Sequence, residues 1–166
     1  MKITQERLKE LLTYDENTGM FTWAIDRNNR RKKGDIAGCY TKRGYLTIVA
    51  DGKNYTAHQL AWLYTYGEYP TYQIDHINGT KDDNRICNLR DVKQSVNCKN
   101  QRKPKRNTSG VIGVYWHKRD KRWTASIKVD GKYINGGSYL EFSDAVNARK
   151  NLEVQYGFHA NHGREK

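Results

Sequence analysis

The segment from residue 74 to residue 100 constrains the fold of this chain most strongly, and it reads IDHINGTKDDNRICNLRDVKQSVNCKN. A short extended run ends at Asp75 and His76. The polar loop that follows, over residues 78–84, is rich in Gly and Asx residues that can satisfy their own backbone groups. A second strand is predicted around residues 89–92, and a helix from about residue 94. That arrangement could place Asn97, one turn into the helix, beside the end of the first strand.

The residue types in this segment suit a metal-assisted hydrolytic site. The Asp75 carboxylate and the Asn97 amide oxygen are hard ligands, which suit a Mg²⁺-like ion that keeps several waters for its substrate. His76 is adjacent, and the ordinary pKa of histidine lies near neutrality, as a general base requires. The alternative is a set of helix-capping and turn-forming residues, since a lone Asp-His pair usually has no function. The whole set of residues favours a site.

These residues resemble the HNH family of ββα-metal nucleases, in particular the small phage and intron-borne homing endonucleases whose motif ends in Asn. The resemblance implies that His76 is the general base and that Asn88 holds the loop and helps to orient the histidine. It also implies that Asp75 and Asn97 hold one divalent ion, Mg²⁺ or Mn²⁺. The expected products are a 5′-phosphate and a 3′-hydroxyl.

The composition points to several small modules that bind a polyanion. Hydrophobic residues make up 36% of the 166 residues and charged residues 29%, which is poor material for one large core. The 30 Lys and Arg residues exceed the 18 Asp and Glu residues, which gives a formal net charge of +12. Such a charge favours binding to nucleic acid.

The sequence gives no sign of export or of membrane insertion. It contains no apolar run long enough to span a bilayer, and its start lacks the apolar segment of a signal peptide. Cys39, Cys87 and Cys98 are odd in number and lack Cys-x-x-Cys spacing, which argues against a disulfide framework and a four-cysteine zinc site. We therefore expect reduced cysteines in the cytoplasm of a bacterial or phage-infected cell.

The first part of the chain is predicted to be rich in β-structure. Residues 4–14 suggest a helix capped by Thr4, and residues 20–23 a short strand. Residues 27–34 form a loop with five positive charges, which is either a solvated turn or a phosphate contact. Asp51 and Gly52 predict a hairpin turn between two β-rich runs, and a helix over residues 58–66 should end at Gly67. His58 starts that helix; it could serve the active site, although such a histidine is more often structural.

A strongly basic segment follows the predicted metal-binding helix. Residues 91–122 hold ten Lys or Arg residues against two Asp residues, a net charge of +8. Such a run is normally a solvated linker, but its position between two modules favours contact with a DNA backbone. The residues predicted to make this contact are Lys99, Arg102, Lys103, Lys105 and Arg106. Pro104 should keep the segment extended.

From residue 109 the pattern predicts an antiparallel sheet and one helix. Strands are expected over residues 111–117, 122–129 and 132–139, and a helix capped by Ser143 from there to about residue 156. The helix should bury Phe142, Ala145, Ala148, Leu152 and Tyr156. Alternation predicts that Val114, Trp116, Trp123, Ala125, Ile127 and Ile134 lie under the helix. The opposite face would present Tyr115, His117, Thr124, Ser126, Lys128, Tyr133 and Asn135, which suits the DNA major groove.

Residues 109–157 resemble the plant ethylene-response (Apetala-two) type of DNA-binding domain, through the stretches GVYW, WTASI, GGSY and AVNAR. Plant members present arginines and tryptophans on the reading face, where this chain has Tyr115, His117, Lys128, Tyr133 and Asn135. That departure puts a plant-like base preference in doubt and leaves the implied DNA-binding role. The alternative is a small α+β packing module.

Together these features predict an α+β protein that contains a small β-rich region (1–52), an HNH nuclease core with a basic linker (53–106), an Apetala-two-like domain (107–159) and a tail (160–166). The predicted function is that of a metal-dependent, site-selective DNA endonuclease with double-stranded DNA as its partner. No membrane and no obligate protein partner are indicated. The alternatives are a DNA-binding regulator without catalysis and a structural RNA-binding protein. The intact set of Asp75, His76 and Asn97 argues against both.

Overall fold

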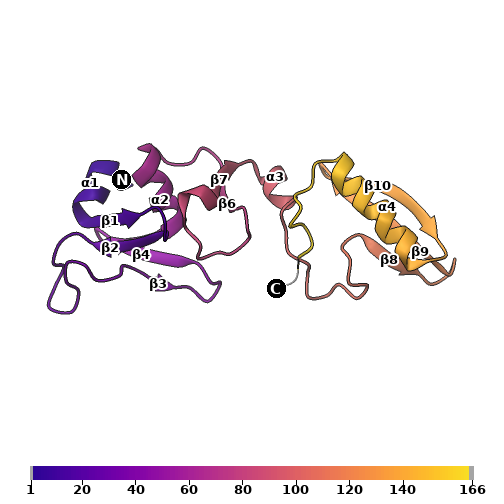
Figure 1. The fold of residues 1–166 in the computed structure, drawn as a ribbon, viewed down its shortest axis with the longest axis horizontal. Helices are drawn as coiled ribbons and strands as arrows, with labels where there is room; N and C mark the ends of the chain where they lie inside the picture. The colour runs from indigo at the N-terminus through magenta and orange to yellow at the C-terminus, as the bar shows by residue number, and fades with distance from the viewer. Residues whose placement is uncertain (1, 165–166) are drawn as a thin grey trace. The chain divides into compact units, whose positions relative to one another are not determined.

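The computed structural model describes residues 2–164 and shows an α+β protein built from small antiparallel sheets and short helices (Figure 1). The chain divides into two compact units, Met1–Lys93 and Gln94–Lys166, called unit 1 and unit 2 below. This agrees with the predicted fold class. Within the described part of the chain, no helix is long and apolar enough to cross a membrane.

Unit 1 begins with a helix followed directly by a hairpin. Helix α1 (Gln5–Leu11) is capped by Thr4, whose hydroxyl oxygen accepts a hydrogen bond from the Arg7 amide at 3.3 Å. Strands β1 (Leu12–Asp15) and β2 (Met20–Trp23) then pair antiparallel. The prediction of a helix as far as residue 14 was therefore wrong at its end. Leu12 and Tyr14 are buried on one face of β1, which a longer helix would not achieve.

The next hairpin and helix match the sequence-based prediction, whereas strand β3 was not predicted. Strands β3 (Cys39–Tyr40), β4 (Leu46–Ala50) and β5 (Lys53–Thr56) form one antiparallel sheet. Asp51 and Gly52 connect β4 to β5 with φ angles of 45° and 74°, the positive values that a tight hairpin turn requires. Helix α2 (Ala57–Tyr66) ends at Gly67, whose φ of 80° provides the left-handed cap.

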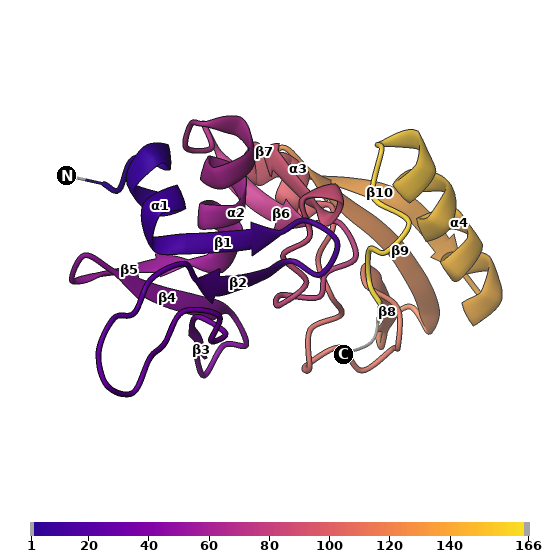
Figure 2. The ribbon, with the colours of Figure 1, turned by 60° about the vertical axis from the view of Figure 1, so that its left-hand side comes forward.

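The predicted strand–loop–strand segment is present at the end of unit 1 (Figure 2). Strand β6 (Gln73–His76) pairs antiparallel with β7 (Leu89–Val92), and a 3₁₀ turn (Ile86–Asn88) leads into β7. The pairing places Asp75 opposite Arg90 and His76 opposite Leu89. The connecting loop contains the polar residues 78–84, as predicted.

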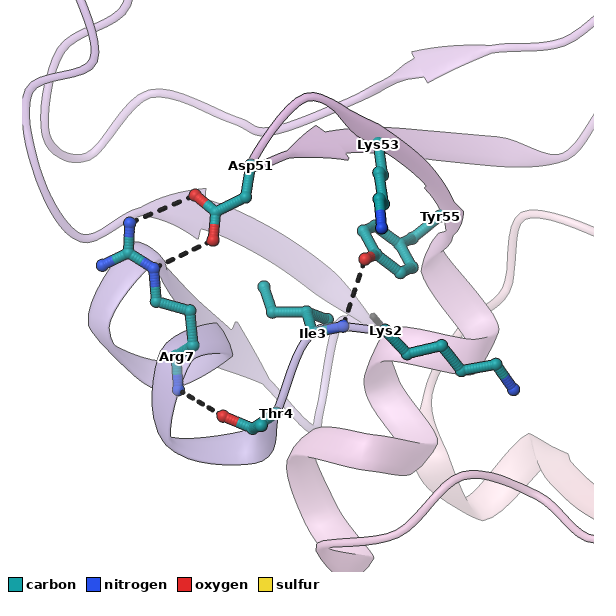
Figure 3. A pocket seen from close by; sticks show the side chains of 7 residues that line it. All are labelled: Lys2, Ile3, Thr4, Arg7, Asp51, Lys53 and Tyr55. Carbon is teal, nitrogen blue, oxygen red and sulfur yellow. Dashed lines mark hydrogen bonds and ion pairs between the residues drawn. The ribbon is translucent and has the colours of Figure 1, made fainter.

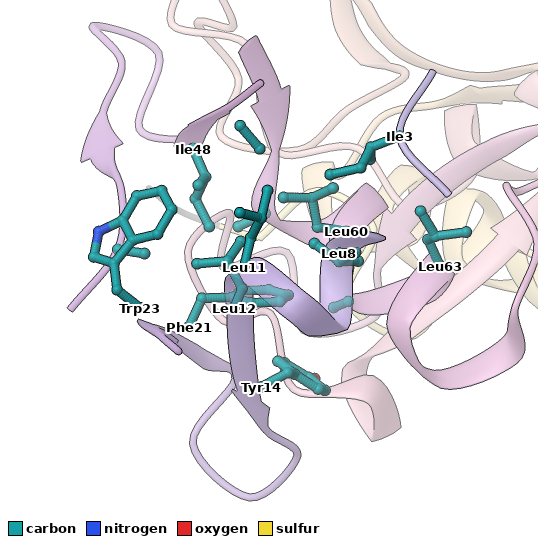
Figure 4. Close-up of a cluster of buried hydrophobic side chains, with 14 of the residues drawn as sticks. Ile3, Leu8, Leu11, Leu12, Tyr14, Phe21, Trp23, Ile48, Leu60 and Leu63 are labelled. Carbon is teal, nitrogen blue, oxygen red and sulfur yellow. The ribbon is translucent and has the colours of Figure 1, made fainter. Parts of the chain in front are cut away.

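One apolar core holds unit 1 together (Figure 4). Leu8, Leu11 and Phe21 from the first elements pack with Ile48 and Leu60 from the sheet and α2. Residues on both sides of position 52 contribute to this core, so the predicted N-terminal region and the first part of the predicted nuclease core fold together. The predicted boundary after residue 52 falls in the turn between β4 and β5, which belong to one sheet.

Unit 2 contains the predicted sheet and helix. It starts with helix α3 (Gln94–Cys98), and strands β8 (Val114–His117), β9 (Arg122–Val129) and β10 (Lys132–Tyr139) form a sheet in the order β10-β9-β8. Helix α4 (Phe142–Gln155) packs on this sheet. A side chain at Gly136 would lie 2.7 Å from Leu152, so glycine allows the helix to approach the strand closely.

Three details of unit 2 differ from prediction. Strand β8 starts at Val114, because residues 107–111 form a turn in which Ser109 Oγ and Asn107 Nδ2 donate to the Val111 carbonyl. Helix α4 starts one residue before Ser143, and its N-cap position is Glu141. Trp116 is 43% exposed instead of buried under the helix, and it packs edge-on against Trp123.

The buried face of α4 carries charged residues that the sequence pattern missed. Ala145 is buried as predicted, but Arg149 and Glu153 are buried too. The Arg149 guanidinium donates to the Ser126 carbonyl (2.8 Å) and to Glu153 Oε1 (3.1 Å), and its Nη2 lies 3.3 Å from His162 Nε2. Unit 2 is thus built partly around a polar cluster, Arg149–Glu153–His162.

The end of the described chain pairs with the basic segment. The amides of His159 and Gly163 donate to the carbonyls of Lys99 and Gln101, at 3.1 and 2.8 Å. The Lys103 amide donates to the Arg164 carbonyl at 3.0 Å. The predicted linker and the predicted tail therefore hold each other within unit 2; residues 165 and 166 of that tail lie outside the described residues.

Candidate active site

His76 occupies the end of β6, where it is buried among aromatic and amide groups. It is 5% exposed, and its Nε2 lies 3.3 Å from the side-chain oxygen of Asn84. The ring of His58 stands perpendicular to it, with 5.2 Å between the centroids. Burial lowers the pKa of His76, although the Asn84 contact and the nearby carboxylate of Asp75 act in the opposite direction. At neutral pH the imidazole is therefore neutral, the form that can accept a proton.

Two further aromatic residues enclose the His76 ring. His58 lies in the first turn of α2, and its Nε2 is 3.1 Å from the Thr56 hydroxyl. Tyr45 lies near both histidines, with centroid separations of 5.6 Å to His58 and 6.2 Å to His76. Burial, together with a smaller contribution from the neighbouring His76, lowers the pKa of His58 to about 4. The sequence left the role of His58 open, and the structure places it in contact with the candidate base.

The loop between β6 and β7 is held closed by Asn88. The side-chain oxygen of Asn88 accepts from the Asn78 amide at 3.0 Å, and its Nδ2 donates to Asn78 Oδ1 (3.1 Å) and to the Asp83 carbonyl (2.8 Å). Arg85 donates two hydrogen bonds to the Asp83 carboxylate, and these lower the pKa of Asp83 to about 2. Asn88 therefore joins the two ends of the loop, the geometry that the predicted loop-holding role requires.

Asp75 forms a cross-strand ion pair. It is 7% exposed, and its Oδ2 accepts from Arg90 Nε at 2.9 Å and from Arg90 Nη2 at 2.7 Å. These two hydrogen bonds from a cationic partner orient the buried Asp75 carboxylate. Arg90 was not predicted as a site residue, but the predicted strands already implied that it lies opposite Asp75.

The predicted metal ligands are a carboxylate and an amide, both hard oxygen donors that fit Mg²⁺ or Mn²⁺. Asp75 lies on β6 of unit 1, whereas Asn97 lies on α3 of unit 2. Residues 2–164 contain no cluster of three or more His, Cys, Asp or Glu side chains arranged as a metal site. The shared role of Asp75 and Asn97 as ligands remains a prediction.

The predicted DNA-reading residues lie together on the sheet of unit 2. Tyr115, Ser126, Tyr133 and Asn135 line a shallow hollow of about 320 Å³, together with Thr124 and Ile134. Tyr133 is 76% exposed, and the Lys128 ammonium lies 5.3 Å from its ring centroid. His117 Nδ1 lies 3.1 Å from an Asp120 oxygen at the end of β8. Ile134 lines the same hollow, although alternation predicted it to lie under the helix, and the DNA-reading role of this face remains a prediction.

The basic segment contributes cations of two kinds. The Lys99 ammonium donates to the Tyr156 carbonyl at 2.8 Å, so it serves unit 2 itself. Arg102, Lys105 and Arg106 are exposed, and Lys103 is half-buried. Exposed cations on an ordered backbone suit phosphate contacts better than Lys99 does.

A hollow elsewhere on unit 1 contains none of these candidate residues. It measures about 280 Å³, and Figure 3 shows the side chains that line it, among them Arg7, Asp51 and Tyr55. Arg7 donates to both oxygens of Asp51, and the Tyr55 hydroxyl accepts from the Ile3 amide at 3.1 Å. These contacts fasten α1 to the β4–β5 turn, which is a structural role.

One comparison with known proteins covers the segment that contains these residues. Residues 55–99 match the family model for HNH endonuclease. The matched residues include His58, Asp75, His76, Asn88 and Asn97, and they make up less than half of the chain.

The chain also aligns with two known proteins over more residues than this family match covers. The chain is 35% identical to Protein 3.8 of Escherichia phage T7 over 79 residues, which cover 47% of this chain and 65% of that protein. A solved structure described as "DNA binding and cleavage by the HNH homing endonuclease I-HmuI" aligns at 25% identity with a TM-score of 0.45, over 61% of this chain and 57% of that one. The aligned part is thus less than two thirds of either relative, and a TM-score this low adds no argument. The Apetala-two-like assignment of residues 107–159 remains a prediction.

Asn84 is the contact of His76 that sequence reasoning missed. It was assigned to a turn-forming loop, where Asn is common, yet it is only 1% exposed. No spacing in the sequence distinguishes it from the neighbouring loop residues. Its burial depends on packing against the β1–β2 hairpin, which is distant in sequence.

Proposed function

We propose that this protein is a DNA endonuclease in which His76 is the general base. The observation that carries the proposal is the buried, neutral His76 at the end of β6, adjacent to Asp75 and within a stretch that matches the HNH endonuclease family. A base must be unprotonated and oriented before the substrate arrives. His76 has both properties.

The proposed reaction is hydrolysis of a phosphodiester bond. His76 accepts a proton from a water molecule, and the water oxygen forms a bond to phosphorus as the bond from phosphorus to the 3′ oxygen breaks. The leaving 3′ oxygen takes a proton from solvent, which yields a 3′-hydroxyl and a 5′-phosphate. Asn88 supports this step by fixing the loop that follows β6.

Asp75 and Asn97 are the residues that would hold a divalent cation, Mg²⁺ or Mn²⁺. When bound, such an ion stabilises negative charge on the phosphate and on the leaving oxygen. Arg90 orients the Asp75 carboxylate by donating two hydrogen bonds to it. Both ligands lie within the family match.

DNA binding is assigned to unit 2. The exposed cations Arg102, Lys105 and Arg106 would contact phosphates in any sequence, and Lys103 would support them. The sheet residues Tyr115, His117, Ser126, Lys128, Tyr133 and Asn135 would contact bases. The net charge of +12 supports a polyanionic partner.

Incubation of the protein with plasmid and phage genomic DNA, with Mg²⁺, with Mn²⁺ or with chelator, tests the proposal. Metal-dependent cuts at a limited set of sites, with 5′-phosphate and 3′-hydroxyl ends, are expected. Binding to the same DNA without any cut under all three conditions would instead indicate a DNA-binding regulator. Preference for RNA in a competition with duplex DNA would contradict both.

A further inference from the structure

The hydrogen bond between His76 and Asn84 defines which ring nitrogen can act as the base. A neutral imidazole has one N–H group and one nitrogen with a lone pair. His76 Nε2 lies 3.3 Å from Asn84 Oδ1, an amide oxygen that can only accept. The Asn84 amide cannot be turned around without loss, because its Nδ2 donates to the Asp82 carbonyl at 3.1 Å. Nε2 must therefore carry the proton.

We infer that Asn84 is a positioning residue that fixes the tautomer of His76, so that Nδ1 is the atom that takes the proton from water. This inference rests on the proposed function and extends it to a residue outside the predicted set. It also separates two tasks on one ring, since Nε2 holds the ring in place and Nδ1 performs the chemistry.

Asn84 is suited to this task because it is itself immobilised. Its carbonyl accepts from the Tyr14 hydroxyl at 2.8 Å, within the buried interior of unit 1. Gly19, in the β1–β2 turn, packs so closely that an added side chain would lie 2.7 Å from the Asn84 carbonyl carbon and 2.5 Å from the Arg85 amide. Its φ of 73° also favours glycine. The N-terminal hairpin thus anchors an active-site residue.

His58 completes the restraint from a second direction. Its ring meets that of His76 at an interplanar angle of 89°, with Tyr45 close to both rings. A perpendicular aromatic contact restricts rotation of the imidazole. The ring of His76 is therefore held by a hydrogen bond that it donates to the loop and by packing against α2.

The alternative is that Asn84 only completes the loop. A purely structural residue would affect the stability of unit 1 but would leave the His76 tautomer unchanged. The test must therefore observe the imidazole itself, independently of DNA cleavage.

The test is NMR of the full chain labelled with ¹⁵N in histidine, at one fixed pH above 7, with the His76 signals assigned by their absence in His76→Gln. The wild type should show a protonated Nε2 with a slowly exchanging proton and an unprotonated Nδ1. In Asn84→Ala the slow exchange should be lost and the two nitrogen shifts should converge. Asn84→Asp keeps an acceptor oxygen for Nε2 but loses the donor to the Asp82 carbonyl, so it should retain the protonated, slowly exchanging Nε2 at a pH where His76 is neutral.

Cleavage kinetics on the same variants give the second readout. Asn84→Ala should lower kcat by about 10- to 100-fold with little change in KM, a part of the full contribution of a general base. Tyr14→Phe removes only the hydroxyl that anchors the Asn84 carbonyl, and it should give a smaller loss of the same kind. Asn17→Ala, an exposed position in the β1–β2 turn, is the matched control and should change neither readout.

The inference is overturned if wild-type His76 carries its proton on Nδ1, or if Asn84→Ala leaves the imidazole signals unchanged. If Asn84→Ala does not fold, the same pair of measurements on Tyr14→Phe decides, and unaltered Nε2 proton exchange there overturns the inference. Failure of the proposed function gives a different result, because the wild type would show the expected tautomer and still not cut DNA.

Discussion

The two units of this protein are stabilised in different ways. Unit 1 buries an apolar core of Leu, Ile and aromatic side chains, with the catalytic candidates at its edge. Unit 2 buries the ionic cluster of Arg149, Glu153 and His162 and fastens its basic segment by main-chain pairing with residues 159–164. Unit 1 therefore supplies the rigid support that a general base needs. Unit 2 holds its cations on a backbone ordered by polar contacts.

The largest expected effect is on the free energy of unfolding, and it should differ between the ionic cluster of unit 2 and the apolar core of unit 1. Arg149→Ala removes the guanidinium that contacts both Glu153 and His162 and leaves the buried Glu153 with its Lys150 ion pair; breaking such a buried cluster typically costs about 3–5 kcal/mol and should unfold unit 2 first. Phe21→Ala in unit 1 should cost a similar amount by creating a cavity. Fluorine NMR of fluorotryptophan-labelled protein can follow each unit, since Trp23 and Trp62 lie in unit 1 and Trp116 and Trp123 in unit 2.

The proposed difference between the units is contradicted if, in Arg149→Ala, all four tryptophan signals report unfolding at the same denaturant concentration. Phe21→Ala should instead move the signals of Trp23 and Trp62 alone.

Acid should destabilise unit 1 through His58. The pKa of His58 falls from its ordinary value of 6.5 to about 4 on folding, so the unfolded chain takes up the proton first as the pH decreases. The free energy of unfolding should be unaffected above about pH 6.5 and fall by about 3 kcal/mol between there and pH 4. His58→Phe keeps a ring beside His76 and should remove most of that fall. Denaturant titrations of the wild type and of His58→Phe between pH 4 and pH 6.5 measure this fall. An equal dependence of the free energy of unfolding on pH in the two proteins would contradict the role of His58.

The sequence predicted the elements of the fold well where the signals are local. The turn at Asp51 and Gly52, the helix end at Gly67 and the strands on either side of the 78–84 loop all follow from residues a few positions apart. The set of Asp75, His76 and Asn88 was predicted from residue type and order, and its catalytic role remains a prediction. Arg90 could have been added from the register of the two strands.

Contacts between distant parts of the chain could not be predicted in this way. Tyr14 and Asn84 meet through tertiary packing that no periodicity reports. The burial of Arg149 could not be predicted from the helix pattern, because a buried charge depends on partners from other elements. The basic segment suggested a solvated linker, because its pairing with residues 159–164 is visible only in the folded unit.

The ordered basic segment predicts two distinct effects on DNA affinity. Lys105 and Arg106 changed together to Ala remove two phosphate contacts, which should flatten the slope of log K against log salt by about 1.8. Asn100→Ala removes the side-chain oxygen that accepts from Arg164 at 2.9 Å and loosens the segment without changing charge. It should weaken binding at every salt concentration and leave the slope unchanged. A flattened slope for Asn100→Ala would show that ordering is not its role.

The smallest effects are expected on the sheet face. Lys128→Ala or Asn135→Ala should cost about 1–3 kcal/mol at particular base pairs and little elsewhere. Binding to the cleaved site and to a scrambled duplex distinguishes this from a phosphate contact. Equal losses on both duplexes would assign the sheet to backbone contact.

The most direct test of the central claim compares wild type and His76→Ala on one cleavable duplex, with dissociation constants and single-turnover rates measured in the same buffer. Loss of the general base should slow cleavage by about 10²- to 10⁴-fold while DNA affinity stays within experimental error of the wild type. An unchanged cleavage rate in His76→Ala, with intact binding, would contradict the account.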